Sequence, residues 1–248
     1  MAHPSLPYER NRSLMNIDFG MTAGGVIVGF LVGLTGVGGG ALMTPMLVSL
    51  FGVDPKVAVG SDLVVSLLMK PVGALVHAQR KTVRWDIVGR LVVGSVPGAL
   101  IGVLVVSQLS NSSANAFIKH SLGVALIIAA AAMVFRERVQ ERGTEHQEET
   151  APSRTPFVIG VGLFVGVLVG LTSVGSGSLV IVALSTFYPR LARPHLVGTD
   201  IVQAIPLVGA AALGHMILGD VNFAVASSLL IGAWPGIYFG SQVSSRYS

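Results

Sequence analysis

Two glycine-rich runs contain residue types that can bind an anion without a charged side chain. The first run consists of Thr35, Gly36, Val37, Gly38, Gly39 and Gly40, and the second contains Thr172, Ser173, Gly175, Ser176, Gly177 and Ser178. Glycine lets the backbone leave helical geometry and approach a ligand closely. A helix that begins after such a break presents free N–H groups and the positive end of its dipole. We therefore expect an anion site at the two runs.

The same glycines have a second interpretation, which the sequence leaves open. Small residues let helices in a membrane pack closely, so the runs could serve packing alone. A soluble phosphate-binding loop fits less well, because no Lys-Ser/Thr pair follows the first run and the run lies inside an apolar segment.

Polar side chains inside other apolar segments form a second rank of candidates. They are Asp62, Lys70, His77, Asp200, Gln203 and His215. An ionisable group inside a membrane span is costly, and for that reason it is a functional candidate. Asp62 and Asp200 could couple transport to a proton or a cation, or they could cap helix starts or serve as structural hydrogen-bonding groups. The histidines could switch protonation near neutral pH or form structural hydrogen bonds.

Lys70 belongs to a polar stripe, because Asp62, Ser66 and Lys70 are spaced by four residues and share one helix face. Its ammonium could attract an anion, pair with Asp62, or extend to the membrane surface. Gln203 follows Asp200 by one helical turn, so the two side chains could face the same cavity.

The composition excludes a soluble or disordered protein. Of 248 residues, 52% are hydrophobic and 11% are charged, and the mean hydropathy is +0.74. Soluble domains carry about 25% charged residues.

The chain has no cysteine, so it has no disulfides and no thiolate metal site, and its six histidines do not cluster with carboxylates at ligand spacing. We expect no metal and no cofactor.

The charges are clustered and leave seven apolar segments. These lie near residues 20–52, 57–78, 87–107, 115–135, 157–187, 195–217 and 221–243. A spanning helix needs about 20 apolar residues. The first and fifth segments are too long for one span, since about 32 residues give roughly 48 Å of helix. Each has a glycine-rich run at its middle, which predicts a broken or re-entrant helix. The fold class is therefore an all-α, polytopic membrane protein.

The two halves of the chain resemble each other. Gly33–Gly40 aligns with Gly170–Gly177, Gly60-Ser61-Asp62 with Gly198-Thr199-Asp200, His77 with His215, and Gly94, Pro97, Gly98 and Gly102 with Gly232, Pro235, Gly236 and Gly240. Duplicated halves with interrupted helices are typical of transporters. We predict a polar N-terminal segment (1–19), a first repeat (20–135), a charged linker (136–156) and a second repeat (157–248). The second repeat is expected to lack the last helix, since no segment in it corresponds to the apolar segment 115–135 of the first repeat.

Basic residues predict the orientation. Arg80, Lys81, Arg84 and Arg90 flank one connection, and further arginines lie in the linker, so both are expected to be cytoplasmic. If the first and fifth segments are simple spans, the repeats are parallel and the N-terminus is inside. If they are hairpins, the repeats are inverted and the N-terminus is outside, which the basic residues favour slightly.

The glycine-rich run followed by Gly-Ser/Thr-Asp, with both elements repeated, resembles the TauE/SafE family of sulfite exporter-like permeases. The resemblance covers almost the whole chain. It implies eight helices in two four-helix repeats, one more than the seven visible here. It also implies small sulfur-containing anions as substrates, such as sulfite and sulfonates.

The sequence thus predicts a secondary transporter of sulfite or an organosulfonate in the cytoplasmic membrane, with partners limited to a small anion, the lipid bilayer and, as one option, a second copy of the chain. We expect no enzyme and no nucleic-acid partner. A passive anion channel would use the same glycine breaks. A non-transporting scaffold is a third class. An intramembrane hydrolase based on Ser176 and His215 is disfavoured, because Gly39 occupies the position equivalent to Ser176.

Overall fold

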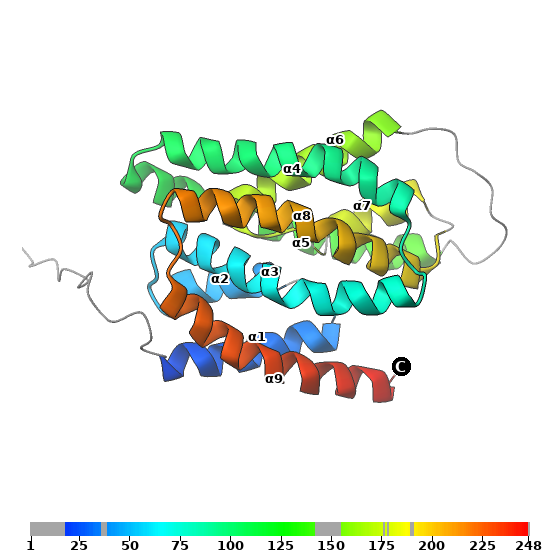
Figure 1. Ribbon diagram of the computed structural model, residues 1–248, viewed down its shortest axis with the longest axis horizontal. Coiled ribbons are helices and arrows are strands. Elements are labelled where there is room, and N and C mark those ends of the chain that lie inside the picture. Colours follow the sequence, from blue (N-terminus) through cyan, green and yellow to red (C-terminus); the bar gives the residue numbers. More distant parts are fainter. Residues whose placement is uncertain are drawn as a thin grey trace, which may run out of the picture.

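The computed structural model describes residues 18–35, 39–141, 155–175, 177, 179–188 and 191–247, and in these residues it contains helices and no strands. The helices are α1 (Phe19–Thr35), α2 (Gly40–Ser49), α3 (Pro55–Gln79), α4 (Trp85–Gln108), α5 (Asn111–Glu141), α6 (Thr155–Thr172), α7 (Leu179–Phe187), α8 (Arg193–Ile217) and α9 (Phe223–Tyr247). They lie roughly along one common direction (Figure 1). The predicted all-α class is confirmed.

Six of the described helices are long and apolar enough to cross a membrane, namely α3, α4, α5, α6, α8 and α9. Large apolar side chains such as Leu68, Leu104, Leu213 and Trp234 are exposed on the outside of this bundle. An exposed apolar surface of this kind suits a lipid environment. The chain is therefore a polytopic membrane protein, as its hydropathy predicts.

The first and fifth apolar segments are both broken at their glycine-rich runs. In the first, α1 ends at Thr35 and α2 begins at Gly40; in the second, α6 ends at Thr172 and α7 begins at Leu179. The end of α2 lies beside the start of α1, since Met46 and Phe51 line the space next to Gly24. The first broken segment therefore folds back on itself as a hairpin.

Two helix pairs, α1 with α9 and α4 with α6, make the most extensive contacts. Glycines allow both, because a Cβ added at Gly29 or Gly98 would overlap the backbone carbonyl of Ala233 or Leu163. The order of such contacts along the chain shows that each pair runs parallel. The glycines at these two helix interfaces therefore serve close packing, as small residues do between helices in lipid.

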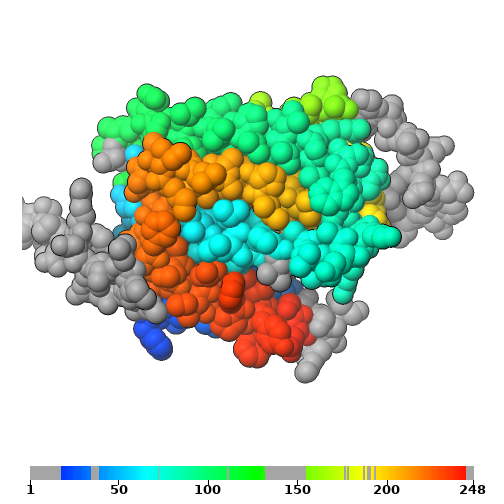
Figure 2. Space-filling view, viewed as in Figure 1, coloured from blue at the N-terminus to red at the C-terminus, as the bar shows by residue number. Residues whose placement is uncertain are grey.

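Helices α3 and α8 form the centre of the bundle. Gly60, near the start of α3, packs on Asp220 just after α8, and Gly198, near the start of α8, packs on Thr82 just after α3. The two helices therefore run antiparallel. Figure 2 shows them side by side on one face, between α4 and α9.

Helix α5 extends to Glu141, beyond the predicted boundary between the first repeat and the charged linker at residue 136. Arg and Glu have good helix propensity, so the helix can continue past its apolar part. The rest of the predicted linker, up to residue 154, lies outside the described residues. Helix α5 packs mainly on α7, α6 and α3.

Candidate functional site

The carboxylate of Asp62 lies at the centre of the bundle, on the inner part of α3. Its side chain is completely buried, with 0% exposure. The Thr44 hydroxyl on α2 donates to Asp62 Oδ2 over 2.6 Å. The other carboxylate oxygen, Asp62 Oδ1, has no hydrogen-bond partner. A buried oxygen without a partner is costly, which makes this position a candidate for binding.

The two glycine-rich breaks meet next to this carboxylate. A Cβ added at Gly40 would overlap the carbonyl oxygen of Ser173, so the start of α2 touches the end of α6. The backbone adopts positive φ angles at Ser173 (62°) and Gly175 (113°). Such a conformation is strained for serine, and backbone strain tends to occur at functional sites. The Ser173 hydroxyl lies beside Asp62 and has no hydrogen-bond partner.

The Thr172 hydroxyl, in the same break, already forms two hydrogen bonds within the protein. Thr172 Oγ1 donates to the Leu168 carbonyl over 2.7 Å and accepts from Val174 N over 3.2 Å. The Gly177 N–H likewise donates to the Gly175 carbonyl. Both groups therefore shape the end of α6 in this structure. Of the remaining break residues, Thr35 ends α1 and Gly39 precedes α2, while Gly36, Val37, Gly38, Ser176 and Ser178 lie outside the described residues.

The second half of the chain contributes Asp200 and Gln203 from α8, and both are buried. Gln203 Nε2 donates to Asp200 Oδ1 over 3.4 Å, while Gln203 Oε1 has no partner. Lys70 on α3 lies within electrostatic range of both Asp62 and Asp200. The structure thus brings these four second-rank candidates together, with a formal charge of −1 when every group is ionised.

We call this group the central cluster and define it as Thr44, Asp62, Lys70, Ser173, Asp200 and Gln203. Sequence reasoning missed Thr44, which lies on the short apolar helix α2. Its only signal was a hydroxyl in the middle of an apolar segment. Such a group is buried only when it has a partner, but the sequence does not show that Asp62 is that partner.

The hypothesis that the two aspartates cap their helices is wrong. The residue that caps α3 is Asp54, whose carboxylate accepts from Lys56 N over 3.0 Å. Asp62 and Asp200 lie well inside α3 and α8.

The neighbouring hydroxyls connect the two halves. Ser61 Oγ accepts from Asn222 N over 3.1 Å, and Thr199 Oγ1 accepts from Arg84 N over 3.1 Å. The Gly-Ser/Thr-Asp motif thus packs its glycine and hydroxyl against a loop of the other half and turns its aspartate to the centre.

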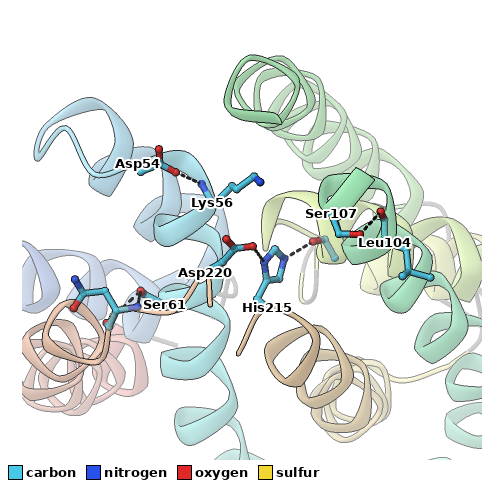
Figure 3. A network of polar contacts seen from close by, with 9 residues as sticks. Asp54, Lys56, Ser61, Leu104, Ser107, His215 and Asp220 are labelled. Carbon is cyan, nitrogen blue, oxygen red and sulfur yellow. Dashed lines mark hydrogen bonds and ion pairs between the residues drawn. The ribbon is translucent and has the colours of Figure 1, made fainter. Parts of the chain in front are cut away.

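The two histidines lie at opposite ends of the bundle and are hydrogen-bonded. His215 is completely buried; its Nδ1 lies 3.3 Å from Asp220 Oδ2, and its Nε2 lies 2.9 Å from the Gly170 carbonyl oxygen (Figure 3). His77 Nδ1 lies 2.8 Å from Thr82 Oγ1. These contacts favour the structural interpretation, since His215 holds the last turn of α6 to the loop after α8.

The described residues include no group of three or more His, Asp or Glu that could hold a metal ion. The central cluster instead offers hydroxyl and amide donors and one ammonium, beside two carboxylates. This set of groups suits a small polar solute that accepts hydrogen bonds.

Comparisons with known proteins agree with the fold. The family model described as "Sulfite exporter TauE/SafE" matches residues 21–248. The probable membrane transporter protein YjnA of Bacillus subtilis is 38% identical over 228 residues, which cover 90% of this chain and 89% of the relative. The probable membrane transporter protein MJ0441 of Methanocaldococcus jannaschii is 29% identical over 243 residues, which cover 90% of this chain and 86% of the relative. No solved structure matches.

Proposed function

The chain belongs to the sulfite exporter TauE/SafE family, and we propose that this membrane transporter carries small sulfur-containing anions, either sulfite or an organosulfonate, as a secondary transporter. The proposal rests above all on one observation: the two helix breaks meet at a buried cluster in which Asp62 Oδ1, Ser173 Oγ and Gln203 Oε1 all lack partners. Native proteins leave few buried polar atoms unsatisfied. Three such atoms in one cluster support the proposal that a solute binds there.

The chemistry of the cluster fits an oxyanion. Lys70 supplies a positive charge, Ser173 supplies a hydroxyl donor, and the Gln203 amide supplies further donor capacity. The start of α2 adds the positive end of a helix dipole close to Ser173. Sulfite and sulfonates carry several acceptor oxygens, so they match the ammonium and the neutral donors of this cluster, which also contains the carboxylates of Asp62 and Asp200.

The helix directions support alternating access. Equivalent helices α3 and α8 run antiparallel, while α1 pairs with α9 and α4 pairs with α6 across the halves. Inverted repeats pack in this reciprocal way, and rocking of one half against the other opens the central site to each side in turn. The hydroxyl contacts of Ser61 and Thr199 with the opposite half would act as the hinges of that motion.

The charge distribution gives an orientation. Arg80, Lys81 and Arg84 lie at the end of the bundle where α3 ends and α8 begins. Lys and Arg are enriched on the cytoplasmic side of membrane proteins. That end would face the cytoplasm, which leaves the start of α1 outside.

The test is anion flux into proteoliposomes that contain the purified protein, using sulfite, sulfate, isethionate and chloride. We expect saturable flux that is selective for sulfite or isethionate and absent from protein-free vesicles. Equal, non-saturating flux of all four anions would instead identify a passive channel, and no flux of any of them would remove sulfur-containing anions as the substrate class.

A further inference from the structure

We propose that each anion crosses the membrane together with one proton, which is bound on Asp62 Oδ1. The inference deepens the proposed function and depends on it, because it presupposes that the central cluster binds the anion. It assigns a coupling ion and a residue that binds it.

The charge of the cluster is the first argument. Asp62 and Asp200 are buried, and the half-buried Lys70 lies within electrostatic range of both; together the three groups carry a formal charge of −1 when all are ionised. An entering anion would bring a second negative charge to a low-dielectric interior, where like charges repel strongly. One proton on a carboxylate makes the empty cluster neutral, so the entering anion no longer meets a net negative charge. Anion binding and proton binding therefore favour each other.

The hydrogen bonds select Asp62 as the proton carrier. Its Oδ2 accepts the Thr44 hydroxyl proton, whereas Oδ1 has no partner. The Ser173 hydroxyl lies beside it and also has no partner. A proton on Oδ1 would convert that oxygen into a donor, which could then bond to Ser173 Oγ or to an anion oxygen. Asp200 differs, because its Oδ1 already accepts from the Gln203 amide, which requires an acceptor there.

Among the described residues, no further titratable group lies close enough to Asp62 to carry the proton in its place. The charged groups near it are Lys70, on the same helix, and Asp200 on α8, which also faces Lys70. Helix α2 carries no titratable side chain. The described titratable side chains of α5 and α9, which also pack on α3, are Lys119, His120 and Tyr238, and all three are exposed.

A proton fits the cluster better than a sodium ion does. The Lys70 ammonium lies close to both carboxylates and would repel a metal cation. A proton instead forms a covalent O–H bond to one oxygen and needs no ring of ligands. The step is pure acid–base chemistry: the O–H bond forms on the side of entry and breaks on the side of release, and no oxidant or reductant takes part.

The experiment measures anion flux and proton flux together in proteoliposomes that enclose a pH-sensitive dye. The probes are isethionate and sulfate, because their charge does not change near neutral pH; if only sulfite is carried, its own titration is subtracted with protein-free vesicles. For the wild-type protein we expect about one proton per anion. For Asp62→Asn we expect a ratio near zero, whatever the remaining anion flux. Asp86→Asn, which removes an exposed carboxylate on α4, should keep the wild-type ratio.

A second measurement tests the proposal if Asp62→Asn transports no anion, so that no flux ratio can be measured. Binding of the same anion to the purified protein should weaken about tenfold per pH unit at alkaline pH in the wild type, and Asp62→Asn should lose this slope. An equal slope in both proteins would overturn the proposal even without flux.

The outcomes separate the two proposals. Anion flux without proton flux in the wild type, or flux that follows a sodium gradient, would overturn proton coupling and leave the proposed function intact. An unchanged proton ratio in Asp62→Asn would place the proton elsewhere and overturn the role of Asp62. Absence of flux and binding for every probe would overturn the proposed function, and the coupling would fall with it.

Discussion

The two halves of the molecule share their framework and differ in their polar interior. Ser61 and Thr199 make equivalent bonds to the loop of the opposite half, at Asn222 and Arg84. Gly60 and Gly198 pack equivalently against those loops. These contacts hold the halves together reciprocally.

Apart from the two aspartates, Asp62 and Asp200, the residues that face the centre are not duplicated. Lys70 and Ser66 on α3 align with Val208 and Ala204 on α8, and Thr44 on α2 aligns with Ile181 on α7. The second half contributes Gln203, which aligns with Val65. The comparison teaches that the two halves keep the same contacts where they build the fold and differ in most of the polar groups that they turn to the centre, as the proposed single, asymmetric binding site requires.

The largest effect is expected where the two halves meet. Gly40→Leu would push α2 away from Ser173, because even a Cβ overlaps that carbonyl. Displacing a binding group by about 1 Å lowers activity about a hundredfold, so we expect anion flux to fall by at least that factor while membrane insertion persists. Gly160→Ala on α6 is the matched control, since a Cβ there has no neighbour within 4 Å. Normal flux in Gly40→Leu would show that the breaks do not form the site.

The next effect concerns the asymmetry at Lys70. Lys70→Met removes the ammonium and keeps a similar length, and we expect KM for the anion to rise about tenfold to a hundredfold, as loss of a charge-assisted hydrogen bond does. Val208→Ala changes the equivalent, completely buried position on α8 without adding volume and should leave KM within about twofold. Similar KM values for both variants would contradict a direct role of Lys70 in binding.

A smaller effect distinguishes the two histidines. His215→Gln removes a ring that contacts both Asp220 and Gly170, and two buried bonds of this kind contribute about 1–3 kcal/mol to stability. His77→Gln removes a bond to a partly buried hydroxyl, and we expect a loss of about 0.5–1 kcal/mol. Thermal unfolding in detergent measures both. Equal shifts in Tm would show that the link to the α6 break adds no stability.

The smallest effect tests the shared framework. Ser61→Ala removes a hydroxyl that both accepts from and donates to the Asn222 backbone, and we expect about 1 kcal/mol of destabilisation. Thr199→Val removes one bond, to Arg84 N, and should lower Tm slightly less. If these variants changed the substrate preference instead of Tm, the hydroxyls would belong to the site rather than to the framework.

Much of the fold followed from local properties of the sequence. The ends of α3, α4 and α8 lie within a few residues of the apolar segments predicted from charge clustering. Both breaks fell at the glycine-rich runs, because glycine is the residue that most weakens a helix. The boundary after α5 was less predictable, since charged residues with good helix propensity continue a helix beyond its apolar part.

The site was only partly predictable. The sequence singled out Asp62, Lys70, Asp200 and Gln203, because ionisable and amide groups inside apolar segments are rare. It assigned Thr172 to the anion, whereas in the structure that hydroxyl bonds to the end of α6. The packing glycines of α4 and α9 and the glycines of the helix breaks could not be told apart, since both occur in apolar segments and differ only in what lies opposite them.

The sequence by itself determined that this protein is helical and crosses the membrane, where its helices break, and which ionisable and amide groups lie inside apolar segments, because hydropathy and glycine content act locally. Only the tertiary structure decided that Thr44 binds Asp62, that Gly40 touches Ser173, and that Lys70 lies within electrostatic range of carboxylates from both halves. These contacts join residues far apart in the chain. They depend on the relative directions and depths of packed helices, which follow from side-chain fit across the whole bundle rather than from any one segment.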